Sequence, residues 1–208
     1  GVSMPELAVD QNIPELARQG KAAQKQFHAW GYKRPLMYRI FMPDASPAAI
    51  AVGLKHGQNY CWDAGQCRLR YAWYGGFVDP SPVWRGNGNG LAGVLGTKYW
   101  ESEMPGTIRV GGADSEPEFL GYKKVDGQPE FHFRVNDTEV YELITPLHSI
   151  VGIQRSFRIP NNTQVVSLPV GPTSQVTFEH SAGKLENGLL SLSAEEARAF
   201  TVFIGLIK

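Results

Sequence analysis

Apolar and polar positions alternate along much of the chain after Pro35. Between Cys67 and Trp73, apolar side chains occupy every second position, and Arg68 and Arg70 stand between them. A period of two is typical of an extended strand, because successive side chains point to opposite faces of a sheet. We therefore expect one face of this strand to carry both arginines and the core face to carry Leu69, Tyr71 and Trp73.

Further runs, some alternating and some short and apolar throughout, predict an all-β fold. They cover Leu36–Met42, Ala48–Leu54, Phe131–Val135, Val151–Ile159, Ala199–Leu206 and residues 163–170, 174–179 and 188–192. The 23 glycines and 14 prolines are scattered between these short runs. About ten strands at a spacing of about 8–12 residues are typical of a large antiparallel β-sandwich. At the level of the fold, this strand pattern is also similar to the supersandwiches of mutarotase-like proteins. Residues 75–106 carry little strand signal, so we expect a long irregular segment there.

Helical signals are confined to two places. Residues 12–30 predict a helix, because Asn12 and Pro14 suit a helix start and alanines follow. This helix or arm would fill residues 1–35, and the β-sandwich domain would fill residues 36–208. Ser193 and Glu196 have the spacing of a capping box, which predicts one helical turn before the last strand.

Composition limits the partners. The chain of 208 residues has 20 Lys and Arg against 20 Asp and Glu, so its net charge is zero. A nucleic-acid-binding protein shows a basic excess, which this chain lacks. No apolar run approaches the roughly 20 residues that span a bilayer, so we expect no membrane span.

Two cysteines, Cys61 and Cys67, leave three alternatives open. A disulfide needs a chain reversal between them, and Asp63 and Gly65 suit such a turn. A disulfide is therefore the favoured interpretation. The alternatives are two buried free thiols, or a metal site completed by His56 and Asp63, although the spacing matches no common zinc pattern.

An aromatic-rich segment is the favoured ligand site. Residues 60–85 hold seven of the chain's 23 aromatic side chains, together with several charged ones. Aromatic faces beside polar groups suit a sugar-binding surface. The ordinary alternative is that the same aromatics fill the core. The candidate ligand-binding residues are Trp62, Asp63, Arg70, Trp73, Asp79 and Trp84.

Catalysis is the second hypothesis. A carbohydrate-active enzyme, such as a mutarotase, hydrolase or lyase, needs carboxylates or a histidine–carboxylate pair in a cleft. The candidate catalytic residues are Asp79, Glu142, His148 and His180. No Gly-x-Ser-x-Gly, P-loop or dinucleotide-binding motif is present, and no metal site or cofactor is expected.

The residues also resemble a known kind of domain. The most specific part is Cys61–Phe77, and the resemblance covers roughly residues 36–206, through Phe41–Asp44, Ile50–Leu54, Asn59–Trp73, Gly75–Asp79, Phe119–Tyr122 and Glu195–Val202. This pattern is similar to a β-domain found beside c-type cytochrome domains and quinoprotein sugar-dehydrogenase-like propellers in exported bacterial proteins.

The resemblance implies a periplasmic or extracellular location and a redox partner rather than redox chemistry in this chain, which has no Cys-x-x-Cys-His motif. Together these observations lead us to expect a non-catalytic accessory module. It would bind carbohydrate or a cytochrome-type partner domain through residues 60–85.

Overall fold

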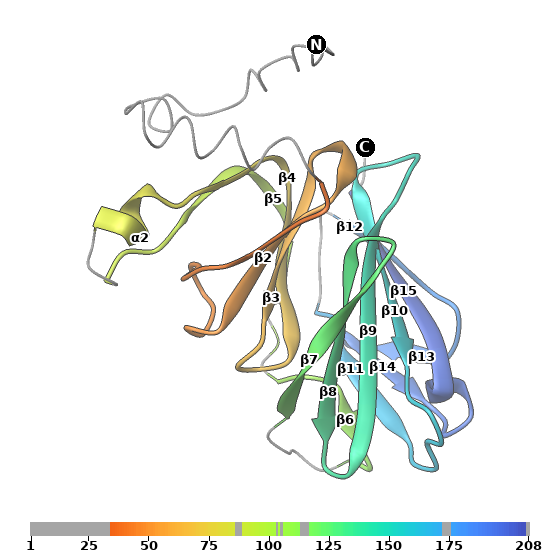
Figure 1. The fold of residues 1–208 in the computed structure, drawn as a ribbon. Helices are drawn as coiled ribbons and strands as arrows, with labels where there is room; N and C mark the ends of the chain where they lie inside the picture. The colour runs from red at the N-terminus through yellow and green to blue at the C-terminus, as the bar shows by residue number, and fades with distance from the viewer. Residues whose placement is uncertain are drawn as a thin grey trace.

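The computed structural model describes residues 34–85, 89–102, 104, 106–112, 117–171 and 176–206 (Figure 1). Strands make up 59% of the described residues and helices 7%. The all-β prediction is therefore confirmed. The helix predicted over residues 12–30 lies outside the described residues, as does the arm up to residue 33.

In the described part of the chain all strand pairs are antiparallel, and the strands form three sheets. The five-stranded sheet has the order β1 (Leu36–Arg39), β2 (Ala49–Gly53), β3 (Gln58–Asp63), β4 (Arg68–Asp79), β5 (Gly93–Glu101). The six-stranded sheet has the order β12 (Val176–His180), β15 (Ala199–Leu206), β10 (Gly152–Arg158), β9 (Thr138–Pro146), β8 (Gln128–Val135), β7 (Glu118–Val125). The four-stranded sheet has the order β13 (Lys184–Glu186), β14 (Leu189–Leu192), β11 (Val166–Pro169), β6 (Arg109–Val110). Short helices are η2 (Lys55–Gly57), α2 (Ser81–Arg85) and η3 (Glu196–Arg198).

One large core joins the three sheets into a sandwich. The inner face of the six-stranded sheet is apolar at every second residue, as in Phe131, Phe133 and Val135 of β8. Side chains of the five-stranded sheet, such as Trp62, and of the four-stranded sheet, such as Leu168, pack into the same cluster. The six-stranded sheet therefore forms one layer of the sandwich, and the other two sheets face it.

The sequence pattern of the last strand is confirmed in detail. Phe200, Val202 and Ile204 are buried on one face of β15. The backbone N–H of Ser193 donates to Glu196 at 2.8 Å, and the Glu196 N–H donates back to the Ser193 hydroxyl at 3.4 Å. This capping box precedes the 3₁₀ turn η3, as predicted.

A β-bulge changes the predicted facing of β4. Trp62 pairs with Leu69 and Cys61 pairs with Tyr71, so Arg70 is an extra residue without a cross-strand partner. Leu69 consequently packs in the main core, whereas Tyr71 packs on the opposite face of the sheet. All three predicted core residues of this strand are buried, but the prediction that they share one face is wrong.

A second, smaller core covers the outer face of the five-stranded sheet. It contains Cys61, Tyr71, Trp73, Phe77 and nearby apolar residues of the segments around Met42 and Ala92. The Ala92 N–H donates to the Phe41 carbonyl at 2.8 Å, which ties the two segments together. Both faces of this sheet are thus buried, which explains why its strands carry so few exposed polar residues.

The predicted irregular segment over residues 75–106 contains parts of two strands and a short helix. β4 continues to Asp79 and β5 runs from Gly93 to Glu101, with α2 between them. A side chain at Gly96 would collide with the Tyr74 carbonyl, and one at Gly76 would collide with the Leu95 carbonyl. Glycine here permits close approach of the two strands and, because it has no side chain, leaves no alternating pattern to read.

Candidate functional site

Trp62 is a core residue. Its side chain is fully buried, and its ring stacks on Phe131 with centroids 4.0 Å apart and planes 3° from parallel. Its indole N–H donates to Glu142 at 3.0 Å. The core alternative for this aromatic is therefore the correct one.

Asp63 is also buried, and it organises the turn between β3 and β4. Its carboxylate accepts hydrogen bonds from the backbone N–H of Ser46 at 2.8 Å and of Gly65 at 2.9 Å, and from the Ser46 hydroxyl. With its oxygens occupied by these donors, the carboxylate is unavailable to a ligand.

Trp73 has a similar structural role in the second core. Its ring is fully buried beside Phe77, and its indole N–H donates to the carbonyls of Gly76 at 2.9 Å and Phe77 at 3.1 Å. The predicted role of Trp73 in ligand binding is therefore not supported by its position.

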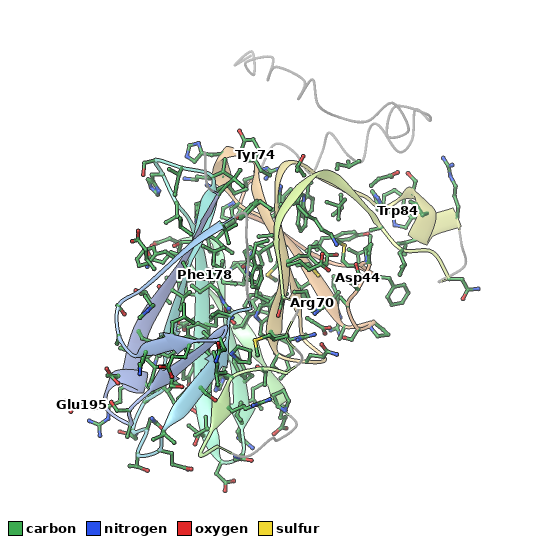
Figure 2. All side chains as sticks on the ribbon, turned by 180° about the vertical axis from the view of Figure 1, so that it is seen from behind. Asp44, Arg70, Tyr74, Trp84, Phe178 and Glu195 are labelled. Atoms are coloured by element: carbon green, nitrogen blue, oxygen red, sulfur yellow. The ribbon has the colours of Figure 1, made fainter. Side chains whose placement is uncertain are left out.

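Arg70 and Asp79 are half-buried and bound to the chain. The Arg70 guanidinium donates to the carbonyl of Asp44 at 2.6 Å and to that of Ser102 at 3.1 Å (Figure 2). Asp79 accepts a hydrogen bond from the Ser81 N–H at 2.9 Å, where α2 begins. These polar groups stabilise loops and are already paired.

Trp84 is the one member of the predicted set with a large exposed surface. Its side chain is 42% exposed, in α2 at the end of the hairpin formed by β4 and β5 (Figures 1 and 2). Leu91 is 52% exposed in the same hairpin, and Pro82 of α2 is exposed as well. Gly90 packs directly against the carbonyl of Pro82 in α2. The next residue, Leu91, therefore lies next to α2.

We call Pro82, Trp84 and Leu91 the apolar tip. It is fixed to the molecule by Val83, which packs against the second core, and by the buried Ala92. Tyr74, the other strongly exposed aromatic of this segment, lies apart from Trp84 (Figure 2). The sequence pointed to Trp84 by residue type, but Pro82 and Leu91 gave no signal, because exposed aliphatic residues cannot be recognised without the fold.

The predicted disulfide between Cys61 and Cys67 is wrong. Both cysteines are buried and unbonded. Cys61 faces the second core and Cys67 faces the main core, so the sheet lies between the two side chains. Burial raises the pKa of each thiol to about 12. Such thiols are protonated and unreactive at neutral pH, so the alternative of buried free thiols is correct.

The candidate catalytic groups do not converge. Glu142 is buried in the main core, where it accepts hydrogen bonds from Trp62 and, at 2.6 Å, from Arg155. His148 lies in the exposed turn after β9, and the four residue-to-residue steps from Glu142 to Pro146 along this strand alone span about 13 Å. His180 is held by a contact of its Nδ1 with the Ala182 carbonyl at 3.0 Å.

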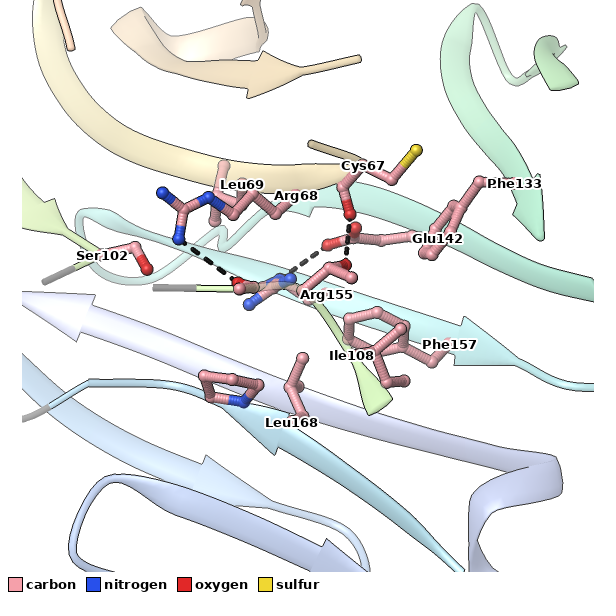
Figure 3. A pocket seen from close by; sticks show the side chains of 13 residues that line it. Cys67, Arg68, Leu69, Ser102, Ile108, Phe133, Glu142, Arg155, Phe157 and Leu168 are labelled. Carbon is pink, nitrogen blue, oxygen red and sulfur yellow. Dashed lines mark hydrogen bonds and ion pairs between the residues drawn. The ribbon is translucent and has the colours of Figure 1, made fainter. Parts of the chain in front are cut away.

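A cavity beside the Glu142–Arg155 pair lies where the three sheets meet (Figure 3). It measures about 10 Å³, which is room for roughly one water molecule. Arg68 lies at this cavity and donates to the carbonyls of Met104 and Gly106. A substrate does not fit into a space of this size.

A wider depression of about 370 Å³ lies on the four-stranded sheet. Its lining is made of small and aliphatic residues, Gly112, Val165, Val166, Ser167, Ser191, Leu192 and Ser193. It contains no carboxylate or imidazole, so its lining provides no general acid or base.

Within the described ranges there is no group of three or more His, Cys, Asp or Glu side chains that could hold a metal ion. The alternative of a metal site at the cysteines therefore has no geometric support among these residues. Nor does any helix of the described residues have the length and apolar character needed to cross a bilayer.

Comparison with models of known protein families found no match. Comparisons with curated proteins and with solved structures found none either. The function must therefore be inferred from the geometry described above.

Proposed function

We propose that this chain is a non-catalytic accessory module that binds a partner protein domain through the apolar tip. The observation that carries the proposal is the exposure of Trp84 and Leu91 on a hairpin that is anchored by a buried core. A tryptophan beside aliphatic side chains on a rigid support is typical of the anchor residues of protein interfaces.

The positions of the polar residues among the candidate ligand-binding residues favour a protein partner over a carbohydrate. A sugar site needs free polar groups beside an aromatic face, because its hydroxyls must be hydrogen-bonded. In this segment Asp63 is buried, and Arg70 and Asp79 are paired within the chain. At the tip Trp84 has the exposed apolar side chains of Pro82 and Leu91 beside it, together with the exposed Arg85.

The kind of partner follows from the resemblance of residues 36–206 to domains found beside c-type cytochromes. We take a cytochrome-type domain as the partner and the periplasm or extracellular space as the location. A disulfide would agree with such a location, but Cys61 and Cys67 are free and give it no further support. The module would contribute shape and apolar contact, while the haem of its partner would carry the electrons.

A direct binding measurement tests this function. The purified chain is titrated with a c-type cytochrome domain and, separately, with a panel of plant and algal oligosaccharides, using calorimetry. Binding of the cytochrome domain alone supports the proposal. Binding of an oligosaccharide alone would replace it with a carbohydrate-binding function, and turnover of an oligosaccharide would replace it with catalysis.

A further inference from the structure

Two histidines from distant parts of the sequence lie together at one end of the sandwich. His56 belongs to η2, between β2 and β3, and His148 belongs to the turn between β9 and β10. Their ring centroids are 6.4 Å apart and their planes are inclined by 54°. Both side chains are exposed. Neither imidazole forms a hydrogen bond or ion pair with any residue that the structure describes.

A buried glutamine holds the two turns against each other. The amide nitrogen of Gln58 donates to the Leu147 carbonyl at 2.8 Å, and its amide oxygen accepts from the Gly152 N–H at 2.8 Å. Gln58 is only 2% exposed and lies two residues after His56. This double hydrogen bond fixes the turn that carries His148 to the strand that follows His56.

The backbone at His56 is itself in an unusual conformation. Its φ is 60° and its ψ is 33°, the left-handed region that glycine adopts freely and that Asn, Asp and His adopt more often than other residues. The exposed side chain of His56 lies at the end of the molecule where His148 lies.

We propose that His56 and His148 form a binding site for a late first-row divalent cation such as Zn²⁺ or Cu²⁺. Neutral imidazole is a preferred ligand of these ions, and water would complete the coordination. With a metal–nitrogen distance of about 2.0–2.1 Å, two imidazoles on one tetrahedral ion have centroids about 5 Å apart. Rotation of two exposed side chains about their χ angles covers the remaining difference of about 1 Å.

This site is independent of the proposed partner binding. It lies in η2 and in the turn between β9 and β10, which Gln58 holds together. The apolar tip lies elsewhere, on α2 and at Leu91. A metal bound by both turns would also link the five-stranded sheet to the six-stranded sheet. Binding should therefore raise the free energy of unfolding as the metal concentration rises.

The test uses the full chain, freed of metal with a chelator. Zn²⁺ and Cu²⁺ are each titrated at pH 7.5 by calorimetry into the unchanged protein and into the variants His56→Ala, His148→Ala and His180→Ala. We expect one site, with affinity at least about tenfold weaker in each of the first two variants and unchanged in His180→Ala. Copper should bind more tightly than zinc.

A second measurement identifies the ligands directly. A substoichiometric amount of Cu²⁺ should broaden the ring NMR signals of His56 and His148 together and leave those of His132 and His180 sharp. The proposal is overturned if millimolar zinc does not bind, if only one of the two variants loses affinity, or if His180→Ala weakens binding equally. Near-UV circular dichroism verifies that each variant is folded.

Discussion

The ring of Trp62 in β3 lies flat on the ring of Phe131 in β8, with centroids 4.0 Å apart. This stack crosses from the five-stranded sheet to the six-stranded sheet at the centre of the main core. The indole N–H adds a buried hydrogen bond to Glu142. Trp62 therefore joins the two layers of the sandwich. This aromatic residue of the segment Cys61–Phe77 has a structural role.

We expect Trp62→Ala to lower the free energy of unfolding by about 3–5 kcal/mol, because it leaves a large cavity and an unpaired acceptor on Glu142. Urea denaturation followed by circular dichroism measures this effect. Trp84→Ala is the matched control, since Trp84 lies largely at the surface. A loss below about 1 kcal/mol for Trp62→Ala would contradict its place in the core.

The ion pair between Arg155 and Glu142 gives a second prediction. Both side chains are buried, with Nε and Oε1 2.6 Å apart. Arg155→Met should cost about 3–5 kcal/mol, because the Glu142 carboxylate is left buried without its partner. Adding Glu142→Leu should restore much of this loss, since an apolar pair replaces the charges. A double-mutant cycle from denaturant unfolding measures the coupling, and additive effects would show that the two groups do not interact.

Gln58 gives a third prediction. Gln58→Ala removes both hydrogen bonds that tie the turn at Leu147 to β3, so we expect a loss of about 1–3 kcal/mol. Amide exchange should accelerate at Gly152, whose N–H loses its acceptor. Gln154→Ala is the control in β10, the strand that begins with Gly152, because the Gln154 amide donates to the half-buried Ser156. Unchanged exchange at Gly152 would disprove the clamp.

Because both cysteines are buried, we expect the stability of the fold to fall at alkaline pH. In the folded chain burial raises the thiol pKa of Cys61 and Cys67 to about 12, above the ordinary value of 9.0. The unfolded chain therefore loses these protons first as the pH rises. The resulting stabilisation is complete below about pH 9 and is lost between about pH 9 and pH 12.

Urea titrations at a series of alkaline pH values measure this loss, with Cys61→Ala/Cys67→Ala as the comparison. The double variant should lose stability less steeply over the same pH interval. In the native protein at pH 8, a thiol reagent should modify neither cysteine, and unfolding should expose both. A native mass two hydrogen atoms below that of the reduced chain would indicate a disulfide and contradict the structure.

The parts of the fold that the sequence predicted are those governed by short-range patterns. Alternation revealed the strand from Phe131 to Val135, because one face is buried along its whole length. The capping box at Ser193 and Glu196 was readable because both bonds form within four residues. Such signals do not depend on which strand becomes the neighbour.

The candidate site was predicted less well, because burial there depends on distant segments. Arg70 is a bulge residue only because of the register between β3 and β4, and this register moves Tyr71 to the opposite face from Leu69. The second core that buries Trp73 is built from segments around Met42 and Ala92, which carry no periodic pattern. Alternation placed Trp73 on a buried face, but the sequence did not show that a separate core buries it.

The central claim is that the apolar tip binds a partner domain. The most direct measurement compares the affinity of a c-type cytochrome domain for the unchanged chain, for Trp84→Ala, and for Tyr122→Ala, using surface plasmon resonance. Tyr122 is the matched control, because it is 47% exposed and belongs to β7 of another sheet. We predict that Trp84→Ala weakens binding at least about tenfold with an unchanged unfolding curve, while Tyr122→Ala binds normally. Equal affinities for all three proteins, or no binding to any of them, would contradict the claim.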